Sequence, residues 1–352
     1  MRHVHQPRGS VKGLCSVPQT LYGPGLALLV TGVCLLGIVS VISLMVGARP
    51  MTIRSVVGAL LSPRDVSLEQ IIIIDYRLPR TLLGLLCGAA FGVSGALIQA
   101  MTRNPLADPG VLGVNAGAAF FVTVAVGIFG ISSIQGYLWA SFAGAITVTL
   151  VVYGLGTSGR DSVTPVRLVL AGVAISAVLA GFGSSITLLD PQAFDALRMW
   201  SIGSIAGRDI EVVTTVAPFI VTGLVLALAA ARPLNAIALG DDLACTLGAN
   251  MMRLRIFVVI AVTLLAGAGT AAAGPIAFVG LMVPHAVRWV TGPDQRWIIG
   301  LTIVFSPALL LTADIMGRLI LYPGELEAGI VTAFIGAPVL IMLARHSKAS
   351  GL

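Results

Sequence analysis

The stretch PGVLGVNAGAAFFVTVAVGIFGISSIQGYLWASFAGAITVTLVVYGLGTSG (109–159) runs for 51 residues without a Lys, Arg, Asp, Glu or His. Just before it, TLLGLLCGAAFGVSGALIQAMT (81–102) is also uncharged over 22 residues. About 20 apolar residues cross the ~30 Å hydrocarbon core of a bilayer as one helix, because a helix satisfies its own backbone hydrogen bonds where no water is available. We therefore expect an all-α chain that spans a membrane.

The composition of the whole chain agrees with this expectation. Of its 352 residues, 57% are hydrophobic and 10% are charged, whereas about a quarter of the residues in a soluble domain are charged. No polar stretch is long enough to form a separate soluble domain, so we expect a short tail (1–25) and one membrane domain (26–345). The first apolar run, 26–46, is longer than the core of a signal peptide and is not followed by a convincing cleavage site, which indicates a retained span.

The apolar runs predict about ten transmembrane helices. Gly274-Pro275 interrupts one uncharged run and separates the seventh span from the eighth. The expected spans are 26–46, 81–101, 111–130, 134–155, 167–189, 211–231, 256–273, 276–290, 297–313 and 327–344.

The distribution of charge predicts the orientation. With ten spans both termini lie on one side, and that side holds 13 Lys and Arg against 5 acidic residues. The other side holds 8 basic and 10 acidic residues. The excess of Lys and Arg marks the cytoplasmic side of a multi-pass protein, so both termini are expected in the cytoplasm and the chain in the cytoplasmic (inner) membrane.

The rarity of ionisable residues within the spans narrows the function. Ion-coupled carriers keep buried acids, histidines or arginines as relays, and a membrane hydrolase needs paired acids or metal ligands. The chain has only two lysines and no GxxxxGK[ST] motif, so it is not itself a P-loop ATPase. Its four cysteines show no metal-binding spacing. These observations argue against a secondary transporter, a membrane hydrolase and a metal site, and if the chain moves cargo uphill, the energy must come from a partner protein. A secondary transporter and a membrane enzyme remain alternatives.

The largest cytoplasmic loop, 232–255, has its own pattern. Leu239, Leu243 and Leu247 recur every four residues and share one helical face, and Gly248 can end that helix. This face either rests on lipid or docks against a cytoplasmic partner.

Several motifs together resemble one known family. They are RLPR (77–80), RNPLADPGVLGVNAGAAF (103–120), PVRLVLAGVA (165–174), ALGDD (238–242), GPIAFVGLMVPH (274–285) and FIGAPVLI (334–341). In this order and spacing they resemble the permease subunits of type II ABC importers for iron-siderophores, haem and cobalamin. The strings are most similar to the ferric-enterobactin branch, which implies a catecholate ferric-siderophore as cargo, with haem or cobalamin as the alternative.

The resemblance also implies partners. A second permease subunit would pair with this chain, as a heterodimer rather than the alternative homodimer. Two cytoplasmic ATPase subunits would consume ATP, and this chain would bind no cofactor. A substrate-binding protein would dock on the extracytoplasmic face.

Three groups of residues take roles by the same resemblance. Arg77, Arg80 and Arg318 would meet carboxylates of the binding protein, and guanidinium forks suit such contacts. The alternative is that these arginines anchor helix ends at lipid headgroups. Glu327 stands where the family often has Pro. The ATPase-coupling group would be Leu239, Gly240, Asp241, Ala244, Leu247 and Gly248, and the cytoplasmic gate would be Thr164, Pro165, Val166 and Arg167.

Overall fold

The computed structural model describes residues 22–61, 67–157, 165–238 and 251–346. Within these ranges the chain is helical and contains no β-strand. The helices are α1 (Tyr22–Met45), α2 (Ile53–Leu61), α3 (Leu68–Ile71), the π-helical turn η2 (Ile72–Arg77), α4 (Leu78–Thr102), the 3-10 turn η3 (Pro109–Leu112), α5 (Val114–Gly127), α6 (Ile134–Thr157), α7 (Pro165–Leu189), α8 (Pro191–Ser201), α9 (Ile210–Ala238), α11 (Met251–Ala273), α12 (Val279–Thr291), α13 (Gln295–Ile320) and α14 (Ala328–His346).

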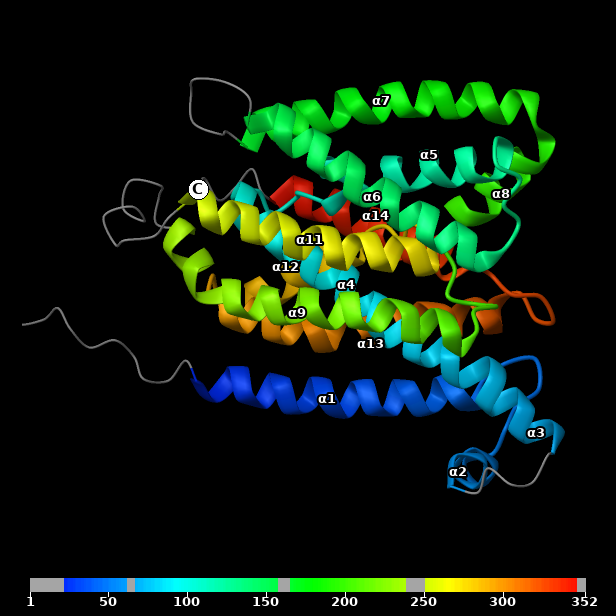
Figure 1. Cartoon of the computed structure of the whole chain (residues 1–352). Coiled ribbons are helices and arrows are strands. Elements are labelled where there is room, and N and C mark those ends of the chain that lie inside the picture. Colours follow the sequence, from blue (N-terminus) through cyan, green and yellow to red (C-terminus); the bar gives the residue numbers. More distant parts are fainter. Residues whose placement is uncertain (1–21, 62–66, 158–164, 239–250, 347–352) are drawn as a thin grey trace, which may run out of the picture.

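The long helices lie side by side in one bundle, and α1 begins at the same end of the bundle at which α14 finishes (Figure 1). Seven helical segments of the described chain are long and apolar enough to cross a membrane. They are Gly25–Met45, Leu68–Thr102, Ile134–Thr157, Val166–Leu189, Ile210–Ile237, Met251–Ala273 and Gln295–Ile320. Shorter helices, α5, α12 and α14, occupy the other three expected spans. Each of the ten expected spans therefore coincides with a helix.

Helix α4 is the centre of the bundle and packs against α9, α11, α12 and α13. Close packing of the helices depends on glycines, which have no side chain. A Cβ placed on Gly95 of α4 would lie 1.9 Å from the carbonyl oxygen of Gly280 in α12. Small residues let membrane helices approach in this way where no hydrophobic force drives them together. The α4–α12 contact is thus fixed by backbone touching backbone.

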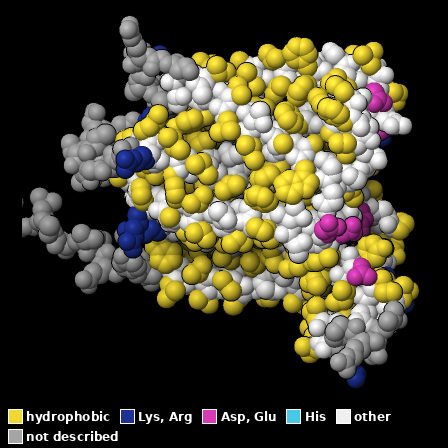
Figure 2. All heavy atoms as spheres, viewed as in Figure 1, with side chains coloured by type: hydrophobic (Ala, Val, Ile, Leu, Met, Phe, Trp, Pro, Cys, Tyr) yellow, Lys and Arg dark blue, Asp and Glu magenta, His cyan; other side chains and the backbone are white. Residues whose placement is uncertain are grey.

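The bundle has an apolar waist and charged ends. In the most apolar window of α1 and of α7, only 17% of the residues are buried, against 83% in the segment that contains α4, so α1 and α7 lie at the periphery. Figure 2 shows hydrophobic side chains over the middle, basic side chains mainly at the end where α1 begins, and acidic ones at the opposite end. This distribution is the one expected for a bundle that spans a membrane.

Four boundaries differ by five or more residues from the sequence-based expectation, one of them the end of α13, which lies at Ile320 rather than near 313. The second span begins as a helix at Leu68 rather than near 81, because η2 continues directly into α4. Helices α9 and α11 extend into the expected loop 232–255, of which 239–250 lie outside the described residues. The break before α12 is confirmed: Gly274 and Phe278 both have positive φ angles, of 73° and 68°.

Two short helices were not expected. Helix α2 follows α1, and α8 joins α7 to the segment before α9. Asp190 caps α8 by accepting a hydrogen bond from the backbone N–H of Gln192, and Pro191 occupies the first turn, a combination that favours a helix start.

Candidate functional site

The three arginines expected to meet the binding protein, Arg77, Arg80 and Arg318, converge at the end of the bundle opposite the start of α1. Arg77 closes η2, Arg80 lies in the first turn of α4, and Arg318 lies in the last turn of α13. Arg77 and Arg318 are 6% and 3% exposed. They therefore do not lie among lipid headgroups, and their guanidinium groups are used inside the chain.

Arg77 and Arg318 bind the end of α1. Arg77 Nη1 donates to the carbonyl oxygens of Leu44 at 2.7 Å and Met45 at 2.8 Å, and Nη2 donates to the carbonyl oxygen of Arg49. The last carbonyls of a helix have no partner within the helix and carry partial negative charge, so cations stabilise them. The first arginine of the RLPR motif thus fixes where α1 ends.

Arg318 reaches the same helix end from α13. Its Nη1 donates to the carbonyl oxygens of Ser43 at 2.8 Å and Val46 at 2.9 Å, and its Nη2 donates to Ser43 Oγ at 3.1 Å. Ser43 Oγ also lies 2.9 Å from Thr81 Oγ1 of α4. Helices α1, α4 and α13 are therefore joined by buried polar contacts.

Asp314 is the carboxylate at the centre of this cluster. Its side chain is 1% exposed and accepts from Arg80 Nη2 at 2.8 Å, from Arg80 Nε at 3.1 Å and from Arg318 Nε at 3.0 Å. Arg318 Nη2 makes a further bond to the same carboxylate. Removing one partner of such a buried pair costs about 3–5 kcal/mol, because it leaves a charge uncompensated.

Glu325 is the second acid on Arg80. Arg80 Nη1 donates to Glu325 Oε2 at 2.7 Å, and the two side chains are 12% and 34% exposed. Pairs this close to solvent contribute about 0–1 kcal/mol. Arg80 thus has one strongly held carboxylate and one weakly held carboxylate.

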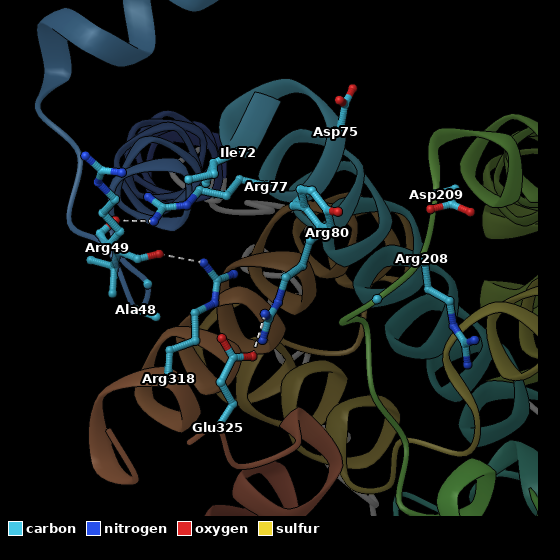
Figure 3. A pocket seen from close by; sticks show the side chains of 14 residues that line it. Ala48, Arg49, Ile72, Asp75, Arg77, Arg80, Arg208, Asp209, Arg318 and Glu325 are labelled. Atoms are coloured by element: carbon cyan, nitrogen blue, oxygen red, sulfur yellow. Dashed lines mark hydrogen bonds and ion pairs between the residues drawn. The ribbon is translucent and has the colours of Figure 1, made fainter. Parts of the chain in front are cut away.

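A cavity of about 340 Å³ opens beside this cluster (Figure 3). Its charged lining residues are five arginines and three acids, and with the buried Asp314 between Arg80 and Arg318 the excess is one positive charge. Burial lowers the pKa of Arg208, whose Nε donates to the carbonyl oxygen of Ala272 at 3.0 Å. A cavity with this lining favours an incoming carboxylate. The charged residues are Arg49, Arg77, Arg80, Arg208, Arg318, Asp75, Asp209 and Glu325.

Glu327, the departure from the family pattern, is used within the fold. Its Oε2 accepts a hydrogen bond from Ser204 Oγ at 3.0 Å, and the backbone N–H of Gly329 donates to the carbonyl oxygen of Gly203 at 2.9 Å. These bonds tie the start of α14 to the segment before α9.

The structure describes three of the residues expected to couple or gate transport, Pro165, Val166 and Arg167. Thr164 and the coupling group Leu239, Gly240, Asp241, Ala244, Leu247 and Gly248 lie outside the described residues. Pro165 begins α7, and the side chains of Val166 and Arg167 are exposed at that helix end.

Hydrogen bonds of Asn235 form a polar clamp between α9 and α13, at the end of α9 that leads into the expected coupling loop. Asn235 Nδ2 donates to Asp294 Oδ1 at 2.7 Å, and the backbone N–H of Gln295 donates to Asn235 Oδ1 at 2.8 Å. The clamp joins the last turn of α9 to the first turn of α13. The position of α13 is thus fixed by polar contacts at both of its ends.

Among the described residues, no group of three or more His, Cys, Asp or Glu is placed to hold a metal ion. Sequence reasoning missed the pairing of Arg80 with Glu325 and the role of Ser43, because these partners are far apart in the chain. The four-residue spacing of Asp314 and Arg318 was the one local signal for this cluster.

Comparison with known proteins identifies the class as a membrane permease. The FecCD transport family matches residues 35–346. The chain belongs to this family.

Individual relatives extend this similarity over the whole chain. The ferric enterobactin transport system permease protein FepD of Escherichia coli (strain K12) is 46% identical over 97% of this chain and 100% of its own length. The Fe(3+)-citrate import system permease protein YfmD of Bacillus subtilis (strain 168) is 43% identical over 81% of this chain and 84% of its own. A metal-chelate type ABC transporter in an inward-facing conformation matches with a TM-score of 0.80 and 27% identity, over 91% of this chain and 99% of that chain.

Proposed function

We propose that this chain is the permease subunit of an ABC importer that carries ferric siderophores, with ferric enterobactin as the expected cargo. The observation that carries the proposal is the 46% identity with FepD over 97% of this chain and 100% of FepD. The other relative named above is an Fe(3+)-citrate permease, which favours iron chelates over haem or cobalamin.

The proposed topology follows from charge. The end of the bundle with the termini carries the excess of Lys and Arg and would face the cytoplasm. The Arg80 cluster would then face outward from the cytoplasmic membrane. The tail 1–25 would be cytoplasmic, and 26–345 would form one membrane domain.

The proposed partners are a second, related permease subunit in a heterodimer, two ATPase subunits and an extracytoplasmic siderophore-binding protein. ATP would be hydrolysed by the ATPase subunits, and this chain would hold no cofactor. Its coupling group Leu239, Gly240, Asp241, Ala244, Leu247 and Gly248 would contact an ATPase, and Thr164, Pro165, Val166 and Arg167 would form the cytoplasmic gate.

Docking of the binding protein would centre on Arg80. Arg77 and Arg318 bind the end of α1 and would contribute mainly charge and rigidity, whereas Arg80 is more exposed, at 12%, and pairs with the partly exposed Glu325. Electrostatic contacts of this kind act mainly on the association rate and weaken with salt.

Uptake of radioactive iron in cells tests the proposal. A strain without this gene should lose uptake of iron presented as ferric enterobactin, and the restored gene should return it only when the ATPase subunits are intact. Iron presented as ferric hydroxamate serves as the cargo control. Undiminished uptake of ferric enterobactin, together with a defect in haem or cobalamin use, would overturn the cargo while leaving the importer in place.

A further inference from the structure

The guanidinium group of Arg80 has a different partner on each edge. Asp314 takes Nε and Nη2, at 3.1 and 2.8 Å, and Glu325 takes Nη1 at 2.7 Å. Because Asp314 covers the Nε–Nη2 edge, a carboxylate from another protein would approach Arg80 on the Nη1 side, where Glu325 lies.

The two acids differ in how firmly they are held. Asp314 is 1% exposed and also binds Arg318, so it cannot leave Arg80 without breaking the buried cluster. The Glu325 side chain is 34% exposed, and Arg80 is its one hydrogen-bond partner among the described residues. Glu325 is therefore the carboxylate that can leave Arg80.

The backbone and the space around Glu325 allow this exchange. The backbone N–H of the next residue, Leu326, donates to the carbonyl oxygen of Gly317 at 3.0 Å, which holds the loop on α13 while the side chain turns. Glu325 and Arg80 both line the cavity of about 340 Å³, which is larger than a carboxylate group (Figure 3). An incoming acid and a displaced Glu325 therefore both have room.

We propose that Glu325 occupies, in the undocked permease, the edge of Arg80 that a carboxylate of the binding protein takes on docking. This inference rests on the proposed function, because it assumes that the binding protein docks at Arg80. Docking then exchanges one carboxylate for another instead of filling an empty cationic site. Glu325 acts as an internal competitor that weakens docking and assists release of the binding protein.

The test measures the affinity of the siderophore-loaded binding protein of this transport system for the complete permease–ATPase complex in lipid nanodiscs. Glu325→Gln should bind about two- to fivefold more tightly than wild type, the range expected for loss of one partly exposed ion pair. Glu211→Gln is the matched control, because Glu211 is an exposed acid in the first turn of α9 at the same end of the bundle. It should change affinity little.

The arginine variants separate this inference from the proposed docking. Arg80→Gln should weaken binding of the binding protein. Adding Glu325→Gln to this variant should not raise its affinity, as expected for two residues that act through one contact. If Arg80→Gln does not accumulate, Arg80→Lys keeps a cation beside Asp314 and takes its place.

Three results would contradict the inference. If the Arg80 variant weakens binding but Glu325→Gln does not tighten it, the exchange is wrong and docking at Arg80 stands. If Glu211→Gln tightens binding as much as Glu325→Gln, net charge alone explains the gain. If the Arg80 variant binds like wild type, docking at Arg80 is wrong, and the exchange with it.

Discussion

Replacing Asp314 with Asn removes the carboxylate on which the polar cluster of α1, α4 and α13 depends. In the wild type this side chain accepts hydrogen bonds from both Arg80 and Arg318 and is 1% exposed. An amide of the same size keeps the packing but removes the carboxylate paired with Arg318, which is itself 3% exposed, and leaves Arg80 with the partly exposed Glu325 as its remaining acid. We expect a loss of about 3–5 kcal/mol in the free energy of unfolding.

The same cluster supplies a matched comparison. Glu325→Gln also removes one carboxylate from Arg80, but Glu325 is 34% exposed. Its loss should cost no more than about 1 kcal/mol. Since 1.4 kcal/mol changes an equilibrium constant tenfold, the two substitutions should differ by roughly a factor of 30 or more in the unfolding equilibrium.

Titration of the purified permease from mild detergent into SDS measures this difference, with helix content followed by circular dichroism. Asp314→Asn should unfold at a much lower fraction of SDS than wild type, and Glu325→Gln close to wild type. Equal shifts for the two variants, or a wild-type midpoint for Asp314→Asn, would refute the claim that burial makes Asp314 the structural partner of Arg80.

Three further predictions concern the rest of the described chain. Gly95→Ala should lower stability by at least about 1–3 kcal/mol in the SDS titration, because its Cβ would lie 1.9 Å from a carbonyl oxygen of α12. Gly300→Ala is the control and should leave the midpoint unchanged, because a Cβ there meets nothing within 4 Å. Asn235→Ala should cost about 1–3 kcal/mol, since it removes the hydrogen bond to Asp294 and leaves a backbone N–H without its partner; an unchanged midpoint would show that the clamp is not structural. Burial raises the pKa of Asp108, so its contribution to stability is present below the ordinary carboxyl pKa and is lost as pH rises through the folded-state value; Asp108→Asn should flatten that dependence, and a parallel pH profile would contradict the assignment.

The sequence was sufficient to place the spans because a bilayer imposes a strong local requirement on each of them. Long uncharged stretches such as 109–159 leave few alternatives to membrane helices. The Gly274-Pro275 break was also visible, because both residues disfavour helix. Exact ends were not: charged residues such as Asp75 suggested a loop before the second span, whereas that segment is helical in the structure.

The short helices carried signals that span prediction does not use. Helix α2 has apolar residues at 53, 56, 57 and 60, which lie on one helical face. Helix α8 has an Asp cap followed by Pro. Both are too short to cross a membrane, so a search for apolar length passes over them.

The sequence selected three arginines that lie together in the structure, but it did not predict their contacts. Motif resemblance selected Arg77, Arg80 and Arg318, and the structure brings all three together. Their partners could not be read from the sequence, because the Arg80–Glu325 contact spans 245 positions and Arg77 binds backbone carbonyls, which leave no mark in residue type. Burial of Arg77 and Arg318 follows from the packing of α1 against α13, which is a property of the whole fold.

Transport by the reconstituted importer tests the central claim most directly. Proteoliposomes containing this chain, its partner permease and the ATPase subunits would be supplied with radioactive ferric enterobactin on its binding protein, with ATP enclosed in the lumen. The account predicts accumulation of iron that requires ATP, the binding protein and this chain together. Accumulation that proceeds without ATP hydrolysis, or that is unchanged when this chain is omitted, would contradict it.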